Sequence, residues 1–341
     1  MMNMKQIVLI LILFVGLIAC ENNEPEFPDF DYTAGFFPYQ YPVRTLVLGD
    51  YIYDNSNDNN RKFLISAAMG GVYSNKQDRI LDIEIADELC AGALFESTQD
   101  TIRLLPSSYY TLSSPNQLII RTGALNGNIE VQLTDAFFDD TLSHRLSYVI
   151  PIRILNAANL DTVLRGKSAF LDPDPRISAL WDIQPKDFTM FAVNYINEYH
   201  GIYLHRGASE VRDGSNTVLE TTVYRKQFVV QNDVSSLLTS GRNRVLWETN
   251  SRSALYPGVL RMYLTFADDG TCTITDAEGS AYSVTGSGRF APEGDEWGGE
   301  RRNAIHINYQ FISGAETLSA TDTLVIRDRA VKMQLFSPMV Y

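Results

Sequence analysis

The side chains best suited to catalysis or metal binding in this sequence are its histidines, and their spacing argues against both roles. His200 and His205 lie five residues apart in a predicted strand, so we expect them on opposite faces unless Gly201 introduces a bulge. No H-E-x-x-H, C-x-x-C or G-x-S-x-G motif occurs, and the acidic residues show no recognisable catalytic spacing. The sequence therefore predicts no catalytic residue, no metal ion and no cofactor.

Residues 54–60 are the one segment that imitates a metal site. Asp54, Ser56, Asp58 and Asn60 alternate like the first ligands of an EF-hand calcium loop. Glycine is missing from the sixth position, and Ile65 stands where the twelfth-position glutamate belongs, so an EF-hand is excluded. A looser calcium site and a solvated hairpin both remain open for this segment.

One of the three cysteines, Cys20, indicates a different chemistry, which is acylation of its thiol. The apolar run from Ile7 to Ala19 suits a signal peptide but falls short of the roughly 20 residues that span a bilayer. It ends in Leu-Ile-Ala-Cys, which resembles a bacterial lipobox. We therefore expect a signal peptide at 1–19 and lipidation of Cys20. The acidic segment behind Cys20, at 21–26, resembles a surface-export signal of Bacteroidota lipoproteins, which implies attachment to the outer membrane at the cell surface. The alternative is an ordinary secretory signal.

The other two cysteines, Cys90 and Cys272, are expected to be buried free thiols. They fall in different predicted domains, and neither has the neighbouring histidine or aspartate that a nucleophilic cysteine needs. The overall charge is also informative, because 28 Lys+Arg against 41 Asp+Glu give a formal charge of −13. Without a basic run to offset this charge, nucleic acid is excluded as a partner.

Strand-like alternation of apolar and polar residues dominates the chain and predicts an all-β fold. Strands are predicted in the first half at 43–48, 63–69, 80–85, 117–121, 129–133 and 148–155. Short strands at this spacing predict an immunoglobulin-like β-sandwich over 36–157, preceded by a tether at 20–35. Residues 158–187 are irregular and rich in proline around Asp172-Pro173-Asp174-Pro175, so we expect a linker there.

The second half predicts about eight antiparallel strands, at 188–204, 218–230, 245–248, 261–266, 271–275, 282–290, 304–311 and 323–327. An even number of strands joined by hairpins can close on itself and so remove its exposed edges. We therefore expect a lipocalin-like antiparallel β-barrel over 188–341.

Several segments resemble a family of Bacteroidota surface lipoproteins. In the first half these are KFLISAAMGGVYSNKQDR (62–79), LLPSSYYTLSS (104–114), IEVQLTDAFFDD (129–140) and SYVIPIRI (147–154). They resemble an N-terminal domain of unknown function that also precedes endo-glucosaminidase and lectin-like modules. In the second half, NYINEYHGIYLHRG (194–207), NYQF (308–311) and TDTLVIRDRAVK (321–332) resemble an uncharacterised domain that often accompanies the first.

The resemblance implies an accessory protein of a polysaccharide-utilisation locus, with a glycan ligand and a receptor/transporter pair for glycan import as partners. Exposed aromatic rings are then the expected contacts, because sugars stack their apolar faces on them. Trp297 is one candidate, since the Glu-Trp-Gly-Gly sequence around it predicts a loop. Trp181, in the predicted linker, is either a platform or an interdomain plug. Tyr203 shares a strand face with Tyr195 and Tyr199, a pattern that is also typical of a barrel core.

Two other function classes remain open beside glycan binding. A structural or adhesive protein would contact other outer-membrane proteins or host surfaces through a contiguous exposed apolar patch. An enzyme would need two carboxylates roughly 5–10 Å apart in a deep cleft. The sequence favours a non-catalytic glycan-binding protein.

Overall fold

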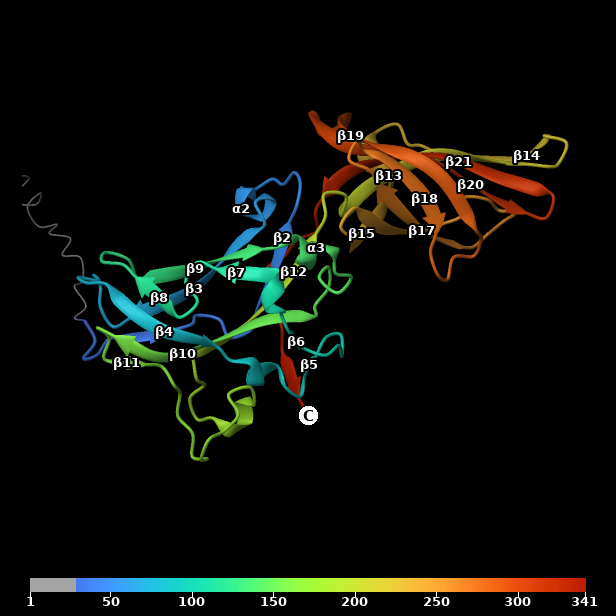
Figure 1. Ribbon diagram of the computed structural model, residues 1–341. Coiled ribbons are helices and arrows are strands. Elements are labelled where there is room, and N and C mark those ends of the chain that lie inside the picture. The colour runs from blue at the N-terminus through green and yellow to red at the C-terminus, as the bar shows by residue number, and fades with distance from the viewer. Residues whose placement is uncertain (1–28) are drawn as a thin grey trace, which may run out of the picture.

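The computed structural model describes residues 29–341 and shows an all-β protein of two domains (Figure 1). The first domain is a sandwich of two sheets. One sheet has the strand order β11-β1-β3-β9-β7, with the bounds β1 Ala34–Phe36, β3 Lys62–Gly70, β7 Tyr110–Leu112, β9 Asn126–Leu133 and β11 Thr162–Val163. The other has the order β22-β2-β12-β10-β4-β8 with β6 beside β10, and the bounds β2 Pro42–Val47, β4 Arg79–Ile85, β6 Arg103–Leu104, β8 Gln117–Ile120, β10 Tyr148–Ala158, β12 Phe188–Ile196 and β22 Gln334–Leu335.

The sandwich core forms because the alternating strands turn their apolar residues toward the facing sheet. Phe63 of β3 stacks on Phe191 of β12 with ring centroids 5.4 Å apart. The buried Tyr195 donates a hydrogen bond from its hydroxyl to the Phe138 carbonyl oxygen at 2.9 Å. The sequence of β10 is apolar at nearly every position of its first half, because both of its faces are covered. A second apolar cluster, which includes Val149 and Phe188, covers the outer face.

The predicted boundary between sandwich and barrel at residue 188 is wrong by one strand. Residues Phe188–Ile196 form β12, which pairs with β10 and β2 inside the sandwich. The predicted linker of 158–187 also belongs to the sandwich, where β11 pairs with β1 and the Lys186 carbonyl oxygen accepts from the Phe37 amide. The barrel therefore begins at Gly201.

The second domain confirms the predicted up-and-down β-barrel. Its nine strands are β13 Gly201–Arg212, β14 Val218–Tyr224, β15 Asp233–Gly241, β16 Arg244–Asn250, β17 Val259–Phe266, β18 Thr271–Asp276, β19 Val284–Trp297, β20 Glu300–Ser313 and β21 Glu316–Asp328. Eight of them close into a ring because β13 pairs with β21 along nearly its whole length. β14 lies outside the ring, as a hairpin with the outer half of β13. The prediction thus had the right number of barrel strands, but it counted β14 and omitted β15.

The barrel interior is filled by side chains. Trp247 is completely buried and lies edge-on to Tyr309 with ring centroids 6.0 Å apart. Tyr199 stacks on Phe266 at 3.7 Å. The barrel is therefore packed where these rings meet, and the hollows described below lie outside it.

After the barrel the chain returns to the sandwich. β22 pairs with β2, and β23 (Pro338–Val340) pairs with β5 (Ala93–Phe95). Phe336 between them is buried against Phe95 and Tyr41. The barrel is thus an insertion between two sandwich strands, and two chain crossings connect the domains.

The helices within residues 29–341 are short and lie in the connections. They are α2 Ser56–Asn59, α3 Asp135–Asp139 and the 3₁₀ turns η1 Asp87–Cys90, η2 Ser107–Tyr109, η3 Ser178–Leu180 and η4 Val229–Gln231. Among residues 29–341, no helix has the length and apolar character needed to cross a membrane.

Candidate functional site

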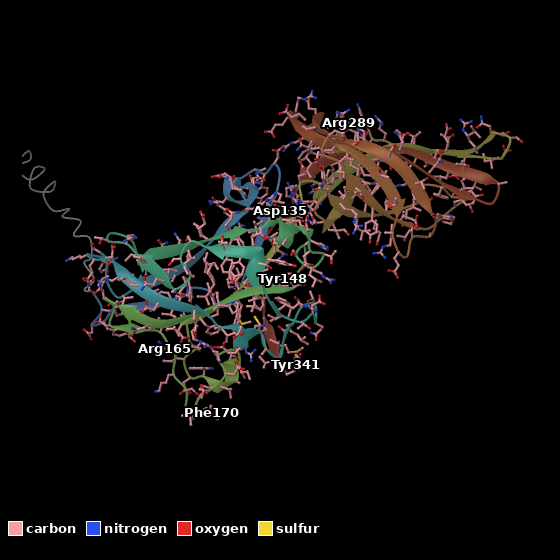
Figure 2. All side chains as sticks on the ribbon, in the orientation of Figure 1. Asp135, Tyr148, Arg165, Phe170, Arg289 and Tyr341 are labelled. Atoms are coloured by element: carbon pink, nitrogen blue, oxygen red, sulfur yellow. The ribbon has the colours of Figure 1, made fainter. Side chains whose placement is uncertain are left out.

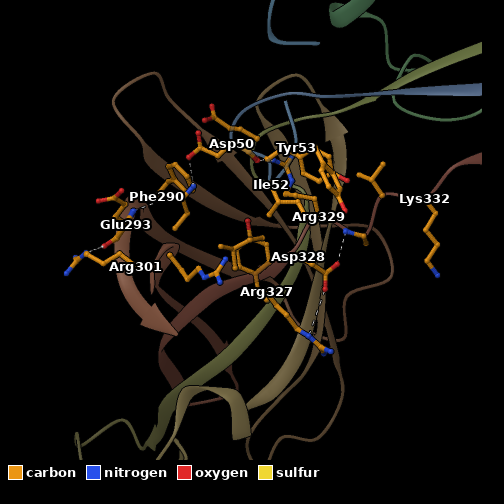
Figure 3. A pocket seen from close by; sticks show the side chains of 18 residues that line it. Asp50, Ile52, Tyr53, Phe290, Glu293, Arg301, Arg327, Asp328, Arg329 and Lys332 are labelled. Atoms are coloured by element: carbon orange, nitrogen blue, oxygen red, sulfur yellow. Dashed lines mark hydrogen bonds and ion pairs between the residues drawn. The ribbon is translucent and has the colours of Figure 1, made fainter. Parts of the chain in front are cut away.

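A hollow of about 520 Å³ lies between the two domains (Figure 3). Residues 50–53, in the loop after β2, form its sandwich wall. Residues from 290 to 303 and from 326 to 332 form its barrel wall. We call it the interdomain hollow. Its volume is within the range of about 300–1,000 Å³ that is typical of small-molecule sites.

The sandwich wall of the interdomain hollow is held by polar side chains of its own loop. Asn55 donates from Nδ2 to the carbonyl oxygens of Val47 and Gly49, both at 2.7 Å. Asp58 is 3% exposed, accepts from the Val47 amide at 2.9 Å, and pairs with the Arg44 guanidinium. Burial nevertheless raises the pKa of Asp58 above its usual range.

The looser calcium site considered for residues 54–60 gains no support from this geometry. Asp58 is used by the loop backbone and by Arg44, and Asp54 accepts from the Ser56 amide at 3.0 Å. No cluster of three or more histidine, cysteine or acidic side chains that could hold a metal ion occurs within residues 29–341. The aspartates of the segment shape the loop.

Arg329 fixes the two walls relative to each other. It is 7% exposed and donates to the carbonyl oxygens of Asp50, Leu48 and Asn197 at 2.8, 3.0 and 2.6 Å. Burial lowers the pKa of its guanidinium. Asn303 of the barrel donates to the Asp50 carboxylate at 3.0 Å, which adds a second link between the domains.

Exposed aromatic and apolar groups project from the sandwich wall. Tyr51 and Tyr53 meet edge to face with ring centroids 5.4 Å apart. Tyr53 and Ile52 are 68% and 77% exposed, and Figure 3 shows both above the barrel wall. Rings held in this way offer stacking surface without losing much side-chain freedom on binding.

The barrel wall supplies hydrogen-bonding groups of both charges. Arg301 donates from Nε to the Glu293 carbonyl oxygen at 2.8 Å. This hydrogen bond does not use the two terminal nitrogens of its guanidinium. Arg327 is half-exposed and lies 3.9 Å from Asp328, too far for a hydrogen bond. The interdomain hollow therefore combines apolar rings with polar groups that can contact a ligand's hydroxyls.

The structure places Trp297 at the end of β19. The predicted loop is a two-residue turn at Gly298-Gly299, so Trp297 is a strand residue and is half-buried. The guanidinium of Arg302, which lines the hollow, lies 5.2 Å from the centre of its ring. Trp297 itself is not one of the residues that line the hollow, and it packs against one of the arginines that do.

The prediction that Tyr203 is an exposed ring for stacking on a sugar is wrong, because its side chain is 1% exposed. Its hydroxyl donates to the Tyr199 carbonyl oxygen at 2.8 Å, and burial raises its pKa. Only an edge of this side chain reaches the interdomain hollow, so its ring cannot stack on a sugar. Tyr195, Tyr199 and Trp247 are core residues, as the strand pattern also allowed.

Trp181 lies far from these residues, in a second hollow of about 560 Å³ on the sandwich. The hollow lies under the loop that follows β11, whose tip carries Phe170 and whose base carries Arg165 (Figure 2). Trp181 donates from Nε1 to the Asp174 carbonyl oxygen at 2.9 Å, and Arg165 pairs with Asp187 at 3.1 Å. With one ring and charged groups that pair with each other, it is a weaker candidate than the interdomain hollow.

The barrel also contains a buried polar cluster that sequence reasoning missed. His205 contacts Asp322 through Nε2 at 2.9 Å and Ser235 through Nδ1 at 3.2 Å, and the Tyr224 hydroxyl donates to Asp322. His205 is 0% and Asp322 1% exposed. The residue types resemble a hydrolase triad, but a substrate cannot reach them. His200 is separate, and its Nδ1 accepts from the Thr239 amide at 3.0 Å.

The structure tests the predictions for two of the three cysteines. Cys20 and the predicted signal peptide lie outside the described residues. Cys90 and Cys272 are buried free thiols, as predicted, and burial raises the pKa of each to about 12.

The sequence analysis also missed Tyr51 and Tyr53. A usable signal was present, because Tyr51-Ile52-Tyr53 directly precedes the turn-rich stretch of 54–60. Apolar rings beside a turn are candidates for exposure.

Comparison with known proteins reproduces the two-domain organisation. A family model for an N-terminal domain matches residues 30–161, and a model for a domain of unknown function (DUF5627) matches residues 198–330. The second match begins close to Gly201, where the barrel begins. No curated protein sequence matches the chain.

A crystal structure of a Bacteroides ovatus protein of unknown function is 33% identical, with a TM-score of 0.85, and the match covers 92% of this chain and 100% of that one. The chain belongs to the family of this protein. A second protein of unknown function from Bacteroides ovatus is 12% identical with a TM-score of 0.41, covering 89% and 99% of the two chains. A multidomain protein from the same organism that includes DUF1735 is 12% identical with a TM-score of 0.40, covering 86% and 94%.

Family membership confirms the architecture that the sequence resemblance implied. The matched domains are of the Bacteroidota type and of unknown function. They indicate no catalytic family.

Proposed function

We propose that this protein is a cell-surface lipoprotein that binds a glycan in the interdomain hollow, as a non-catalytic accessory of an outer-membrane polysaccharide uptake system. The observation that carries the proposal is the composition of the two walls. Tyr51 and Tyr53 line one wall of a space of about 520 Å³, and charged barrel residues line the other. Sugars present apolar faces to rings and hydroxyls to charged groups, so this combination suits them.

The rigidity of the hollow supports binding. Arg329 and Asn303 hold the Asp50 segment against the barrel through hydrogen bonds of 2.8 and 3.0 Å. A site whose walls are fixed before the ligand arrives loses less entropy on binding than a mobile one. The lipobox at Cys20 supports a location at the membrane, where an imported polysaccharide is first met.

Four carboxylates line the hollow, and two of them already accept hydrogen bonds. Asp50 accepts from Asn303 Nδ2, and Asp328 accepts from the Ala330 amide at 2.8 Å. Engagement of Asp50 and Asp328 leaves only Glu198 and Glu293 to exchange protons with a glycosidic bond, which needs a pair of carboxylates on either side of it. We therefore propose a binding protein rather than an enzyme.

Affinity electrophoresis tests the proposal. Protein starting at Glu21 is run through gels that contain plant, host or microbial polysaccharides. Selective retardation by one polymer is the expected result and names the ligand class. Equal mobility in every gel would contradict glycan binding. An unchanged number of reducing ends in the polysaccharides would contradict hydrolysis as well.

A second candidate function is contact with another outer-membrane protein. It is favoured by five exposed apolar residues in the segment from β14 to β15, each more than half exposed, namely Val223, Phe228, Val230, Val234 and Leu238. Val234 and Leu238 share the outer face of β15. Recovery of one outer-membrane partner by crosslinking, lost in a Val234→Ser and Leu238→Ser variant, would favour this function.

A further inference from the structure

Three loops meet at the end of the sandwich that is farther from the barrel. The Phe30 amide donates to the Gly71 carbonyl oxygen at 2.9 Å, and the Tyr73 amide donates to the Asp29 carboxylate at 2.8 Å. The Gly123 amide donates to the Asn75 carbonyl oxygen at 2.8 Å. We call residues 29–33, 71–78 and 121–125 the tether end.

The tether end exposes four large apolar side chains. Phe30, Tyr32, Tyr73 and Leu125 are 78%, 53%, 65% and 44% exposed, and they come from all three loops. Gly71 brings two of the loops together, because its φ of 102° suits glycine and an added Cβ would overlap the Tyr32 carbonyl oxygen. The aromatic residues thus lie on a common, hydrogen-bonded base.

Charge does not oppose contact between this surface and an uncharged interface. The tether end carries Asp29, Asp31 and Asp78 against Lys76 and Arg121, which is a formal charge of −1. Arg121 pairs with Asp78 at 2.7 Å, so the remaining charge is small. Tyrosine is also enriched where proteins meet the polar region of a bilayer.

Covalent reach determines what can lie opposite the tether end. Nine Cα–Cα steps separate Cys20 from Asp29, and a fully extended chain of this length spans about 30 Å. A lipid on Cys20 therefore keeps Asp29 within about 30 Å of the membrane. In Figure 1 the described chain begins at the left end of the sandwich, and the barrel lies at the opposite side.

We propose that the tether end lies on the lipid bilayer, with Phe30, Tyr32 and Tyr73 in its interfacial region, so that the interdomain hollow faces away from the membrane. β3 runs from one end of the sandwich to the other. Its last residue, Gly70, lies at the tether end. Its first residue, Lys62, follows Arg61, and Arg61 pairs with Asp135, which also pairs with Arg242 of the barrel. This inference rests on the lipidation of Cys20 that is part of the proposed function.

Tryptophan quenching by brominated lipid tests the orientation. The chain from Cys20 to Tyr341 is coupled through the Cys20 thiol to a maleimide lipid in phosphatidylcholine vesicles, which attaches it whether or not cells acylate it. Tyr73→Trp is compared with Tyr53→Trp, since the parent tyrosines are 65% and 68% exposed. The added emission of Tyr73→Trp should be quenched at least about twofold more than that of Tyr53→Trp.

Equal quenching of the two variants would overturn the orientation, and the tether end would then be free for a protein partner. Lipidation is measured separately, as incorporation of labelled palmitate in cells by the parent chain and by Cys20→Ser. Its failure would remove the proposed anchor but would leave the vesicle result unchanged. Glycan binding is likewise independent of both measurements.

Discussion

The sandwich and the barrel differ in what fills their interiors. The sandwich core consists of aliphatic and aromatic side chains, as in the contact of Phe63 with Phe191. The barrel has a similar aromatic cluster, but it also encloses a contact between two fully buried ionisable side chains, His205 and Asp322. In the sandwich, the buried Asp58 pairs with the partly exposed Arg44. Apolar packing tolerates small changes in shape, whereas a buried polar group depends on each of its hydrogen-bond partners. The domains should therefore respond differently to mutation.

The largest effect is expected at Asp322. Asp322→Ala removes the acceptor for the fully buried His205 and for the partly buried Tyr224. Each of the two polar groups that lose their acceptor costs about 1–3 kcal/mol, so we expect a loss of about 3–5 kcal/mol in urea unfolding followed by barrel tryptophan fluorescence. Asp322→Asn, which keeps an acceptor oxygen, is the control and should lose less. Equal stability of Asp322→Ala and the parent would show that the cluster contributes nothing.

The next effect concerns pH at the crossing between the domains. Burial, aided by the Arg329 charge, lowers the pKa of His200 from 6.5 to about 4. The unfolded chain therefore binds a proton at a pH where the folded chain does not, so stability falls as pH drops from 6.5 to about 4. The loss amounts to about 3 kcal/mol at most. His200→Gln should show a smaller decrease between pH 7 and pH 4.5 in urea titrations, and an unchanged decrease would contradict this explanation.

Apolar positions should behave alike in the two domains. Ile150 in the sandwich and Ile307 in the barrel are 0% and 1% exposed. Replacing either with valine should cost about 0.5–1.5 kcal/mol, measured by the same unfolding experiment. A much larger loss at Ile307 would show that the whole barrel interior, and not only its polar cluster, is sensitive to change.

The smallest effect is expected where the domains meet at the surface. Arg242 of the barrel pairs with Asp135 and Asp139 of α3 at 2.8 and 3.0 Å, and all three side chains are well exposed. Arg242→Ala should cost less than about 1 kcal/mol, because solvent screens such pairs. Calorimetric melting at low and high salt would check this, and a larger loss would give the contact a structural role.

Much of the fold could be predicted because most inward-facing positions are apolar. β4 and β17 were placed within two residues of their observed bounds. β15 was missed because its inward positions include Ser235 and Thr239, which serve the histidines. Which sheet the segment of 188–196 joins is decided by its pairing with β10, and periodicity carries no information about that.

The candidate site was harder to predict than the fold. Trp297 and Trp181 were chosen for residue type, and the structure separates them into different hollows. The interdomain hollow combines Tyr53 with Arg301, which are 248 residues apart in the sequence. Such a site exists only after both domains have folded and docked, so local patterns cannot reveal it.

Titration calorimetry with the glycan found by electrophoresis tests the central claim most directly. Tyr53→Ala removes an exposed ring of the interdomain hollow, and Tyr39→Ala removes a ring that is 51% exposed elsewhere on the sandwich. Loss of a stacking ring should weaken binding by about tenfold in Tyr53→Ala, while Tyr39→Ala should bind like the parent. Parental affinity in Tyr53→Ala would contradict glycan binding in this hollow.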